Sequence, residues 1–311
     1  MTFEHHPLPT RRRTDDTQDL GPRSRPQRRW WDRGSRDGGR HTALLGLVSP
    51  GTVTLGVAVR TVREVDGGTE VQLPDGTVHA GGVLVGADGV HSVVRGHVAP
   101  RRRARPSILA PSSWRFVATD PGVDCWVAWT GPAGTVLLIP MVPGRVYGWV
   151  SGRDETTDFA RTRALFRGFP EVVRTALAAA EESQDPPLHS PLEEINPAVW
   201  TTGRVVLVGD AAHASAPVWA QGAALAVEDG LALAEVLQDR DAWDRAGLEF
   251  ARRRRARVEH VQAATDRFSR TARLPAWLRS VVAPLVGPPS YRAAYGPLRE
   301  PAGRPEPPVA P

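Results

Sequence analysis

Residues 203–213 carry the sequence GRVVLVGDAAH, and the chain continues to residue 222 as ASAPVWAQG. The apolar run from Arg204 to Val208 is short and rich in valine, which is typical of a buried parallel strand. Asp210 follows this strand directly, and ligands of open α/β sheets bind at the carboxyl ends of the strands. Because a carboxylate there accepts hydrogen bonds from hydroxyl groups, Asp210 is predicted to bind a polyhydroxyl chain such as ribose or ribitol.

A helix is predicted over residues 222–237, after Pro217 interrupts the chain. Gln221 and Gly222 open this helix, whose first amide groups are unpaired and carry a partial positive charge. Such a helix end favours an anion, for example the pyrimidine edge of a reduced flavin. Two plainer interpretations stay open here. His213 is a packed histidine more often than a catalyst, and the alanines at 223, 224 and 226 permit close helix packing.

A second motif lies upstream, where residues 85–95 carry the sequence VGADGVHSVVR. The apolar run over residues 82–87 predicts another buried parallel strand, and Asp88-Gly89 predicts a tight turn after it. Ser92 is placed to cap the following segment. Asp88 is then placed to accept hydrogen bonds, and Arg95 to hold a phosphate or carboxylate. The alternative is a structural turn beside a surface arginine.

Patterns elsewhere predict the remaining elements. A short helix over residues 41–48 is followed by strand at 52–59, and a hairpin turns at Gly67-Gly68 and again at Asp75-Gly76. Residues 107–152 combine Trp, Val, Thr and Tyr with regular turns, which predicts a small antiparallel sheet. Helices are expected over 159–182 and 243–268. The proline-rich tail from Pro284 is expected to be irregular.

Composition excludes several classes of protein. The chain has 311 residues, 41% of them hydrophobic, and one cysteine, Cys125, so neither a disulfide framework nor a multi-cysteine metal site is expected. No apolar run approaches the roughly 20 residues that span a bilayer, and no signal peptide is recognisable. These features predict a soluble, cytoplasmic protein.

The basic character of the chain does not by itself indicate nucleic-acid binding. The sequence pI is about 10.4, but the formal net charge is only +5. All 39 basic residues are arginine, and with abundant Ala, Gly, Pro and Val this composition is typical of a GC-rich genome. Residues 1–39 crowd arginine with Asp, Gly, Pro and Ser and lack apolar periodicity, so they are expected to be disordered or mistranslated.

The two motifs together identify a family. The sequence GADG at 86–89 with Ser92 and Arg95, followed by GDAAH at 209–213 with Pro217 and Gln221-Gly222, resembles the flavoprotein monooxygenases related to para-hydroxybenzoate hydroxylase. The salicylate and 3-hydroxybenzoate hydroxylase-like members are the most similar in appearance. The resemblance extends from Arg40 to about Tyr295. Arg40 resembles an arginine that contacts the cofactor, and Val59 falls where the family's strand passes the adenine.

Smaller matches agree with this family. Trp126 to Gly131, Pro140 and Tyr147 resemble its substrate-domain sheet, and residues 166–170 resemble the segment leading out of it. Residues 249–257 resemble an arginine-rich helix of the family, so Arg252 to Arg255 are interpreted as a solvated helix face. Five tryptophans are candidates to line a substrate pocket, with ordinary sheet core as the alternative: Trp114, Trp126, Trp129, Trp149 and Trp219.

The resemblance implies a function. FAD would bind through Gly209, Asp210, Gln221 and Gly222, with Pro217 near the isoalloxazine ring. Asp88, Gly89 and Arg95 would serve the cofactor and the nicotinamide nucleotide. NADH or NADPH would reduce the flavin, and oxygen would then be transferred to an aromatic or other electron-rich small molecule. The cofactor carries this chemistry, while the protein supplies orientation and water exclusion. No catalytic base and no metal site is assigned, and the oligomeric state is open.

The implied fold is α/β. It is an incomplete, Rossmann-like, three-layer FAD-binding domain with an inserted antiparallel substrate domain and carboxyl-terminal helices. The expected divisions are a disordered or mistranslated segment at 1–39, FAD-binding parts at 40–106 and 191–283, a substrate domain at 107–190 and a proline-rich tail at 284–311. The family's opening strand, G-x-G-x-x-G turn and helix are absent from the sequence, which predicts an amino-terminally truncated or mistranslated chain. Ala220 also stands where the family usually has glycine.

Three alternatives to this function stay open. The chain could be a catalytically inactive remnant, because the missing turn normally cradles the cofactor pyrophosphate. A related flavin oxidase, reductase or halogenase shares the same two motifs. An arginine-driven nucleic-acid binder is the last alternative, and salt-sensitive retention on DNA mapped to residues 1–39 would distinguish it.

Overall fold

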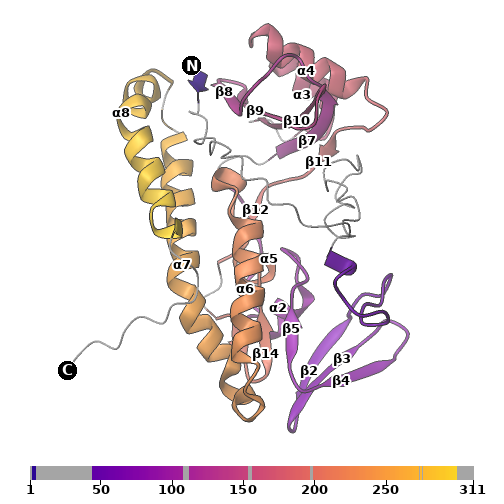
Figure 1. Ribbon diagram of the computed structural model, residues 1–311. Coiled ribbons are helices and arrows are strands. Elements are labelled where there is room, and N and C mark those ends of the chain that lie inside the picture. Colours follow the sequence, from indigo (N-terminus) through magenta and orange to yellow (C-terminus); the bar gives the residue numbers. More distant parts are fainter. Residues whose placement is uncertain are drawn as a thin grey trace, which may run out of the picture. The chain divides into compact units, whose positions relative to one another are not determined.

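The protein divides into two compact units. A computed structural model describes residues 2–4, 44–107, 112–152, 156–196, 199–272, 274 and 276–299 (Figure 1). Of these, the first unit contains 2–4, 44–57, 114–152 and 156–189. The second unit contains the remainder.

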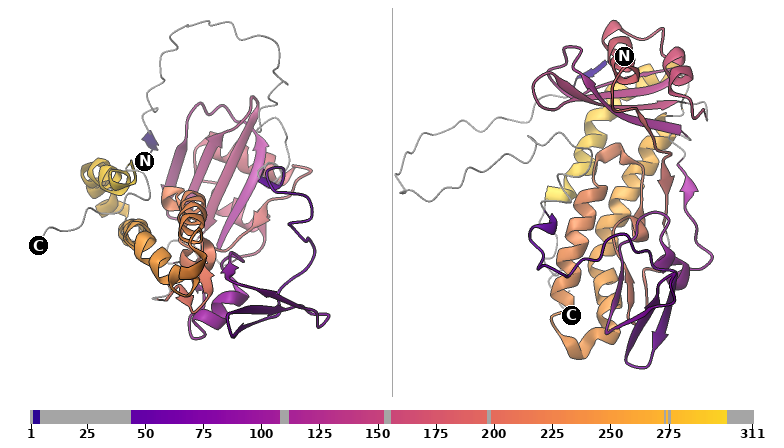
Figure 2. Two further views of the ribbon diagram at one scale, coloured as in Figure 1. Left: turned by 60° about the horizontal axis from the view of Figure 1, so that its bottom comes forward. Right: turned by 90° about the vertical axis from the view of Figure 1, so that its right-hand side faces the viewer.

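An antiparallel sheet forms the first unit. Its six strands lie in the order β1 (Thr2–Glu4), β8 (Val127–Gly131), β9 (Gly134–Pro140), β10 (Arg145–Gly152), β7 (Ser112–Thr119) and β11 (Leu188–His189). The long strands appear side by side in the left view of Figure 2. A tight turn joins β8 to β9, with Gly131 opposite Gly134. The antiparallel sheet predicted for residues 107–152 is therefore confirmed.

Two helices cover one face of this sheet. Val136, Leu138, Val146 and Val150 are fully buried, and they alternate along β9 and β10 as one face of a strand requires. They pack in one cluster with residues of α3 (Phe159–Leu165) and α4 (Glu171–Glu181). The sequence predicted a single helix over 159–182. It is divided because Pro170 lacks an N–H group and serves as the N-cap of α4.

The second unit contains the parallel strands. Strand β14 (Val205–Leu207) lies between β13 (Thr201–Thr202), which is antiparallel to it, and β5 (Leu84–Gly86), which is parallel. Val205 pairs with Leu84, and Leu207 pairs with Gly86. The two apolar runs at 82–87 and 204–208 thus form parallel strands as predicted, and the structure shows that they are neighbours. A separate meander contains β2 (Thr61–Val65), β3 (Gly68–Gln72) and β4 (Val78–Gly81). Its second turn lies at Asp75-Gly76 as predicted, and its first lies at Asp66-Gly67, one residue before the predicted position. Strand β6 (Arg105–Pro106) pairs with β12 (Glu193–Glu194).

Helices surround these parallel strands. The short α2 (Val93–Val98) and α5 (Asp210–His213) each follow one strand, and η2 (Pro217–Trp219) leads into α6 (Gly222–Val236). After η3 (Arg240–Ala242), the long α7 (Trp243–Ala272) runs beside α6 in both Figure 1 and Figure 2. The chain ends its described part with α8 (Ala276–Tyr295) and η4 (Pro297–Arg299). One apolar core joins β14 to α2, α6 and α7.

Two predicted elements differ in the structure. Residues 52–59 form no strand, because Leu55 is 75% exposed, Val57 is 48% exposed, and the segment has no partner strand among the described residues. The tail expected to be irregular from Pro284 instead belongs to α8 as far as Tyr295. Packing on α7, which includes a 3.0 Å hydrogen bond between His260 Nε2 and the Ala294 carbonyl, outweighs the local proline signal.

The predicted α/β fold with an inserted antiparallel sheet and carboxyl-terminal helices is confirmed. The predicted domain boundaries and the missing first βαβ unit stay predictions. Within the described part of the chain, no helix combines the length and the apolar character needed to cross a membrane.

Candidate functional site

Two aspartates follow the neighbouring parallel strands of the second unit. Strand β5 ends at Gly86 and β14 ends at Leu207, and these two residues pair in the parallel register. Asp88 lies two residues beyond the first end, and Asp210 lies three residues beyond the second. Both carboxylates therefore emerge at the edge of the sheet where α/β proteins bind ligands.

The carboxylate of Asp88 is bonded to its own helix. Its Oδ2 accepts hydrogen bonds from the amides of Val93 at 2.7 Å and Val94 at 3.2 Å. Ser92, the predicted cap, accepts from the Arg95 amide through Oγ at 2.8 Å. Gly89 makes the turn possible with a φ of 77°. Asp88 therefore has the structural role that the plainer interpretation of this turn gave it.

Arg95 is not the surface arginine of the plainer interpretation. It is 4% exposed, and its guanidinium donates to the Ala211 carbonyl through Nη1 at 3.1 Å and to the Val90 carbonyl through Nη2. Burial lowers its pKa from the ordinary value, against the opposing charges of Asp88 and Glu193. Since Val90 and Ala211 belong to different motifs, Arg95 ties the two strand-to-helix turns together.

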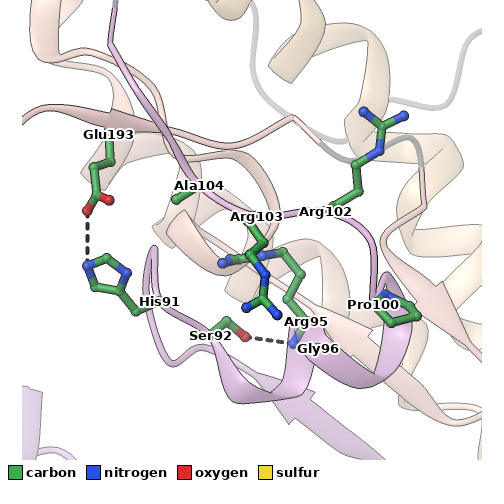
Figure 3. Close-up of a pocket in the computed structure, with 9 residues that line it drawn as sticks. All are labelled: His91, Ser92, Arg95, Gly96, Pro100, Arg102, Arg103, Ala104 and Glu193. Carbon is green, nitrogen blue, oxygen red and sulfur yellow. Dashed lines mark hydrogen bonds and ion pairs between the residues drawn. The ribbon is translucent and has the colours of Figure 1, made fainter.

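A pocket of about 590 Å³ opens beside α2 (Figure 3). Arg95 and Arg103 lie together at its centre, and Arg102 joins them in the lining. His91 and Glu193 close one side, with 3.0 Å between His91 Nε2 and Glu193 Oε2. Three arginines against one carboxylate make this pocket positively charged.

Gly209 turns the chain sharply before Asp210. Its φ of 57° and ψ of −140° suit glycine, and a Cβ built there would lie 3.2 Å from Ala226 Cβ. Of the three alanines expected to allow close packing, Ala226 is thus the one against the turn, while Ala223 and Ala224 are exposed. Because α6 approaches this turn so closely, the turn has a glycine at 209 and the helix has an alanine at 226.

Asp210 faces the start of α6. Its side chain is exposed, and a Cβ built on Gly222 would lie 3.9 Å from its Oδ1. Gln221 is the N-cap of α6 but makes no side-chain capping bond; its Nε2 donates to the Trp219 carbonyl at 3.2 Å instead. An exposed carboxylate and a helix end without a side-chain cap therefore lie together, as the sequence predicted.

The loop between them contains a strained residue. Ala220 has a φ of 52° and a ψ of 30°, the left-handed region, and no other described residue except glycines has a positive φ. This is the position where glycine was expected. Pro217 is exposed at the start of η2, and Tyr295 Oη donates to the Trp219 carbonyl at 2.8 Å, which holds the end of the loop.

A buried carboxylate that sequence reasoning missed lies behind Asp210. Asp229 of α6 is fully buried, and its Oδ2 accepts from the Gly209 amide at 2.9 Å and lies 2.6 Å from His213 Nε2. Its Oδ1 accepts from Arg254 Nε at 2.8 Å. His213, 2% exposed and packed on the Trp200 ring, is therefore a packed histidine, in agreement with the plainer interpretation.

The network continues to the surface through Glu228. Arg254 Nη2 donates to Glu228 Oε2 at 2.8 Å, and Arg257 donates to both Glu228 oxygens at 2.7 Å. The interpretation of Arg252 to Arg255 as a solvated face is thus wrong for Arg254, which is 2% exposed because it pairs with Asp229. A signal was present in the sequence: two adjacent acids interrupt an otherwise mostly apolar helix.

The structure brings some of the predicted site residues together and leaves others apart. The second unit brings together Gly209, Asp210, Gln221 and Gly222, and Arg95 links the Asp88 turn to them. Val59 is half-buried but belongs to no strand. Arg40 lies outside the described residues.

The tryptophans divide among several environments. In the first unit, Trp114 is in the helix-covered core, with its ring 5.3 Å from that of Phe159, and Trp129 packs against the same core. Trp126 is 52% exposed. Trp149 points to the other face of the sheet, because it alternates with the core residues Val146 and Val150. In the second unit, the Trp219 ring packs edge-on against Phe268 and Tyr295.

Comparison with known proteins identifies this arrangement. Residues 58–265 match the model of the family described as FAD binding domain. The chain belongs to this FAD-binding family. Its cofactor is FAD, and the resemblance to FAD-dependent aromatic monooxygenases inferred from the two motifs is confirmed.

Relatives agree with the family. The chain is 31% identical to 2-heptyl-3-hydroxy-4(1H)-quinolone synthase of Pseudomonas aeruginosa over 275 residues, covering 82% of this chain and 70% of that enzyme. It is 34% identical to 3-amino-4-hydroxybenzoate 2-monooxygenase PtmB3 of Streptomyces platensis over 217 residues, covering 63% of this chain and 52% of that enzyme. The match thus spans between half and seven-tenths of these relatives.

A solved structure has the same fold. The chain resembles HpxO of Klebsiella pneumoniae, whose structure contains FAD and uric acid, with a TM-score of 0.73 and 22% identity. The match covers 85% of this chain and 72% of that one.

Proposed function

We propose that this protein is a monooxygenase that binds FAD at the Asp210 turn and uses NAD(P)H and oxygen to hydroxylate a small aromatic or heterocyclic ring. The observation that carries the proposal is the exposed Asp210 carboxylate beside the start of α6. The substrate class is supported by the relatives, which are named for quinolone and aminohydroxybenzoate chemistry.

The residues present fit two parts of FAD. A ribityl chain offers hydroxyl groups, and Asp210 offers acceptor oxygens with no hydrogen bond to another described residue. The pyrimidine edge of a reduced flavin is anionic, and α6 presents amides without a side-chain cap. For the pyrophosphate, the sequence contains no G-x-G-x-x-G turn, so that part of the cofactor has no assigned cradle.

Each residue has a role in this proposal. Asp210 accepts hydrogen bonds from the ribityl hydroxyl groups, and Gly222 leaves room beside it. Pro217 is exposed where the isoalloxazine ring would lie. When bound, FAD supplies the activation and transfer of oxygen. The protein orients the ring and stabilises its negative charge.

The nicotinamide nucleotide is assigned to the positively charged pocket. Arg102 and Arg103 are exposed in its lining, and Arg95 lies behind them at the Asp88 turn. Arginine recognises phosphate groups through planar pairs of N–H donors. A cytoplasmic location and the absence of nucleic-acid binding stay predictions, as do the roles of Arg40 and Val59.

The first experiment is a titration of the purified chain with FAD, followed by flavin fluorescence and by the visible spectrum after desalting. We expect saturable binding, and we expect Asp210→Ala to abolish retention of the flavin. Retention in the variant equal to that of the wild type would contradict the assigned site.

A second experiment tests catalysis. NAD(P)H oxidation, oxygen uptake and product mass are measured with hydroxylated benzoates and hydroxyquinolones. A hydroxylated product formed with matching oxygen uptake supports the monooxygenase. Flavin binding with no substrate-dependent turnover would favour the inactive remnant, and turnover without oxygen incorporation would favour a related flavin oxidoreductase.

A further inference from the structure

The helix that carries Asp210 is too short to hold itself. Helix α5 has 4 residues, and its amides at Ala212 and His213 both bond the Gly209 carbonyl at 2.9 Å. A single helical turn is unfavourable alone, because it fixes several dihedral angles for few hydrogen bonds. Gly209 adds a backbone conformation with a positive φ at its start. The conformation of this turn must therefore come from contacts with other elements.

Asp229 supplies contacts at both ends of that turn. One oxygen of its carboxylate accepts from the Gly209 amide at 2.9 Å and lies 2.6 Å from Nε2 of His213, the last residue of α5. The other oxygen accepts from Arg254 Nε at 2.8 Å. The carboxylate thus spans α5 from its N-cap to its last residue and joins it to α6 and α7.

Two further contacts hold the middle and the exit of the turn. Arg95 donates to the Ala211 carbonyl at 3.1 Å, and Gln262 of α7 donates to the His213 carbonyl at 3.4 Å. Ala211 and Ala212 are fully buried. Asp210 is the one residue of α5 whose side chain is exposed. The other residues of α5 are buried, and contacts with the protein interior fix their positions.

Charge favours the Asp229 contacts. Burial acts to raise the pKa of Asp229, but His213, the Gly209 amide and Arg254 together hold it below its ordinary value. The side chain is therefore a carboxylate at neutral pH and accepts a hydrogen bond from each partner. A buried ion pair is a poor source of net stability compared with apolar packing, because both charges lose their water. Its directional bonds to α5 are what an apolar residue could not supply.

We propose that Asp229 is a positioning residue for the flavin site: it sets the conformation of the Gly209–His213 turn and so fixes where Asp210 presents its carboxylate to FAD. This inference rests on the proposed function for its consequence, but the positioning itself is a property of the protein without cofactor. Asp229 has no exposed surface, so its proposed effect on FAD is indirect and passes through the turn.

Glu228 provides a matched control. It precedes Asp229 on α6, carries the same charge and shares the partner Arg254, yet it accepts its hydrogen bonds from Arg254 and Arg257 of α7. Glu228→Gln therefore weakens the α6–α7 network without touching α5. Asp229→Asn keeps the shape of the side chain but retains one acceptor oxygen for the donors on both sides.

Hydrogen–deuterium exchange of the cofactor-free chain tests the positioning. We expect Asp229→Asn to accelerate exchange of the amides at 209–213 by about tenfold or more, beyond the change at other core amides, since each lost bond involved a charged group. In Glu228→Gln, any acceleration at 209–213 should stay within about twofold of the acceleration at the other core amides of that variant. Equal acceleration in the two variants would overturn the proposal.

FAD affinity then tests the consequence. Fluorescence titration of the folded variants should show a Kd raised about tenfold or more in Asp229→Asn and within about twofold of wild type in Glu228→Gln. Altered exchange with unchanged affinity would overturn the link to FAD. If the wild-type chain binds no FAD, the proposed function fails while the exchange experiment still decides the positioning.

A folding defect is separated from a positioning defect by a second variant. His213→Gln removes the imidazole at the other end of the same contact and leaves Asp229 paired with Arg254. If Asp229→Asn does not fold, as judged by near-ultraviolet circular dichroism, His213→Gln should still accelerate exchange at 209–213. Unchanged exchange there would contradict the proposal.

Discussion

The turn after β5 and the turn after β14 place an aspartate at the same edge of the sheet, and they treat it differently. Asp88 accepts bonds from two amides of its own helix, Val93 and Val94. Asp210 is exposed and makes no hydrogen bond with another described residue. Its turn is instead held from behind by Asp229. In the first turn Asp88 itself stabilises the backbone. In the second turn Asp229 has that role, and the Asp210 carboxylate is left available to bind a ligand.

This comparison separates two meanings of one sequence signal. An aspartate after a buried strand predicts either a cap or a ligand group, and the local sequence does not distinguish them. The distinction lies in whether the backbone amides nearby have another partner. At the β14 turn the Gly209 amide bonds Asp229, a residue 20 positions away.

Breaking the link between the two turns should have the largest effect. Arg95→Met removes the donors to Val90 and Ala211 and leaves two carbonyls unpaired in a buried region. We expect the free energy of unfolding to fall by roughly 2–4 kcal/mol, measured by urea denaturation. Arg102→Met, an exposed change in the same pocket, should cost less than about 0.5 kcal/mol. Equal losses in the two variants would contradict the linking role.

Removing the available carboxylate should affect the ligand and spare the fold. Asp210→Ala should raise the Kd for FAD at least about tenfold, the scale of one charge-assisted hydrogen bond. Its free energy of unfolding should change by less than about 0.5 kcal/mol, because the side chain is exposed. Calorimetry and flavin fluorescence measure the two quantities on the same sample. A large loss of stability with normal FAD affinity would show that Asp210 serves the fold and not the ligand.

Removing the capping carboxylate should show the opposite pattern. Asp88→Ala leaves two amides of α2 without their acceptor and should lower the free energy of unfolding by about 1 kcal/mol. Asp88→Asn retains an acceptor oxygen and should recover most of that loss. A weaker effect of Asp88→Ala than of Asp210→Ala on FAD affinity would sharpen the comparison. The reverse order would assign the ligand role to the first turn.

The smallest effect is expected in the loop after Asp210. Ala220→Gly relieves a left-handed residue, worth about 1–2 kcal/mol, and loses about 0.5–1 kcal/mol to the greater freedom of glycine in the unfolded chain. We expect a net stabilisation of roughly 0–1.5 kcal/mol, seen as a small rise in Tm. Ala223→Gly in the first turn of α6 should lower Tm instead. A lower Tm for Ala220→Gly would show that the loop is not strained.

Much of the site could be predicted because its signals are local. The two valine-rich runs, the aspartates after them, and the small residues at 222–224 and 226 all lie within short windows of sequence. The two buried strands were predicted from their apolar runs, whereas the pairing of Val205 with Leu84 was seen only in the structure. The left-handed Ala220 was foreshadowed by the expectation of glycine at that position.

The errors have a common physical cause. Leu55 and Val57 have the apolar character of a strand but found no partner among the described residues, since β structure needs a neighbour. The tail from Pro284 has helix-breaking residues, yet packing on α7 decided its conformation. Local conformational preference is worth a fraction of a kcal/mol to about 3 kcal/mol per residue. At 52–59 no tertiary contact supported the preference for strand, and in α8 tertiary contacts outweighed the preference against helix.

By itself the sequence determined the family, the parallel strands and the place of Asp210, because apolar periodicity and motif order are written along the chain. Only the tertiary structure decided that Arg95 is buried, that Arg254 leaves the solvated face, and that Asp229 holds the turn. These contacts join residues 116 and 25 positions apart. A hydrogen bond requires its atoms to approach within about 3 Å, and packing alone sets that distance between remote segments.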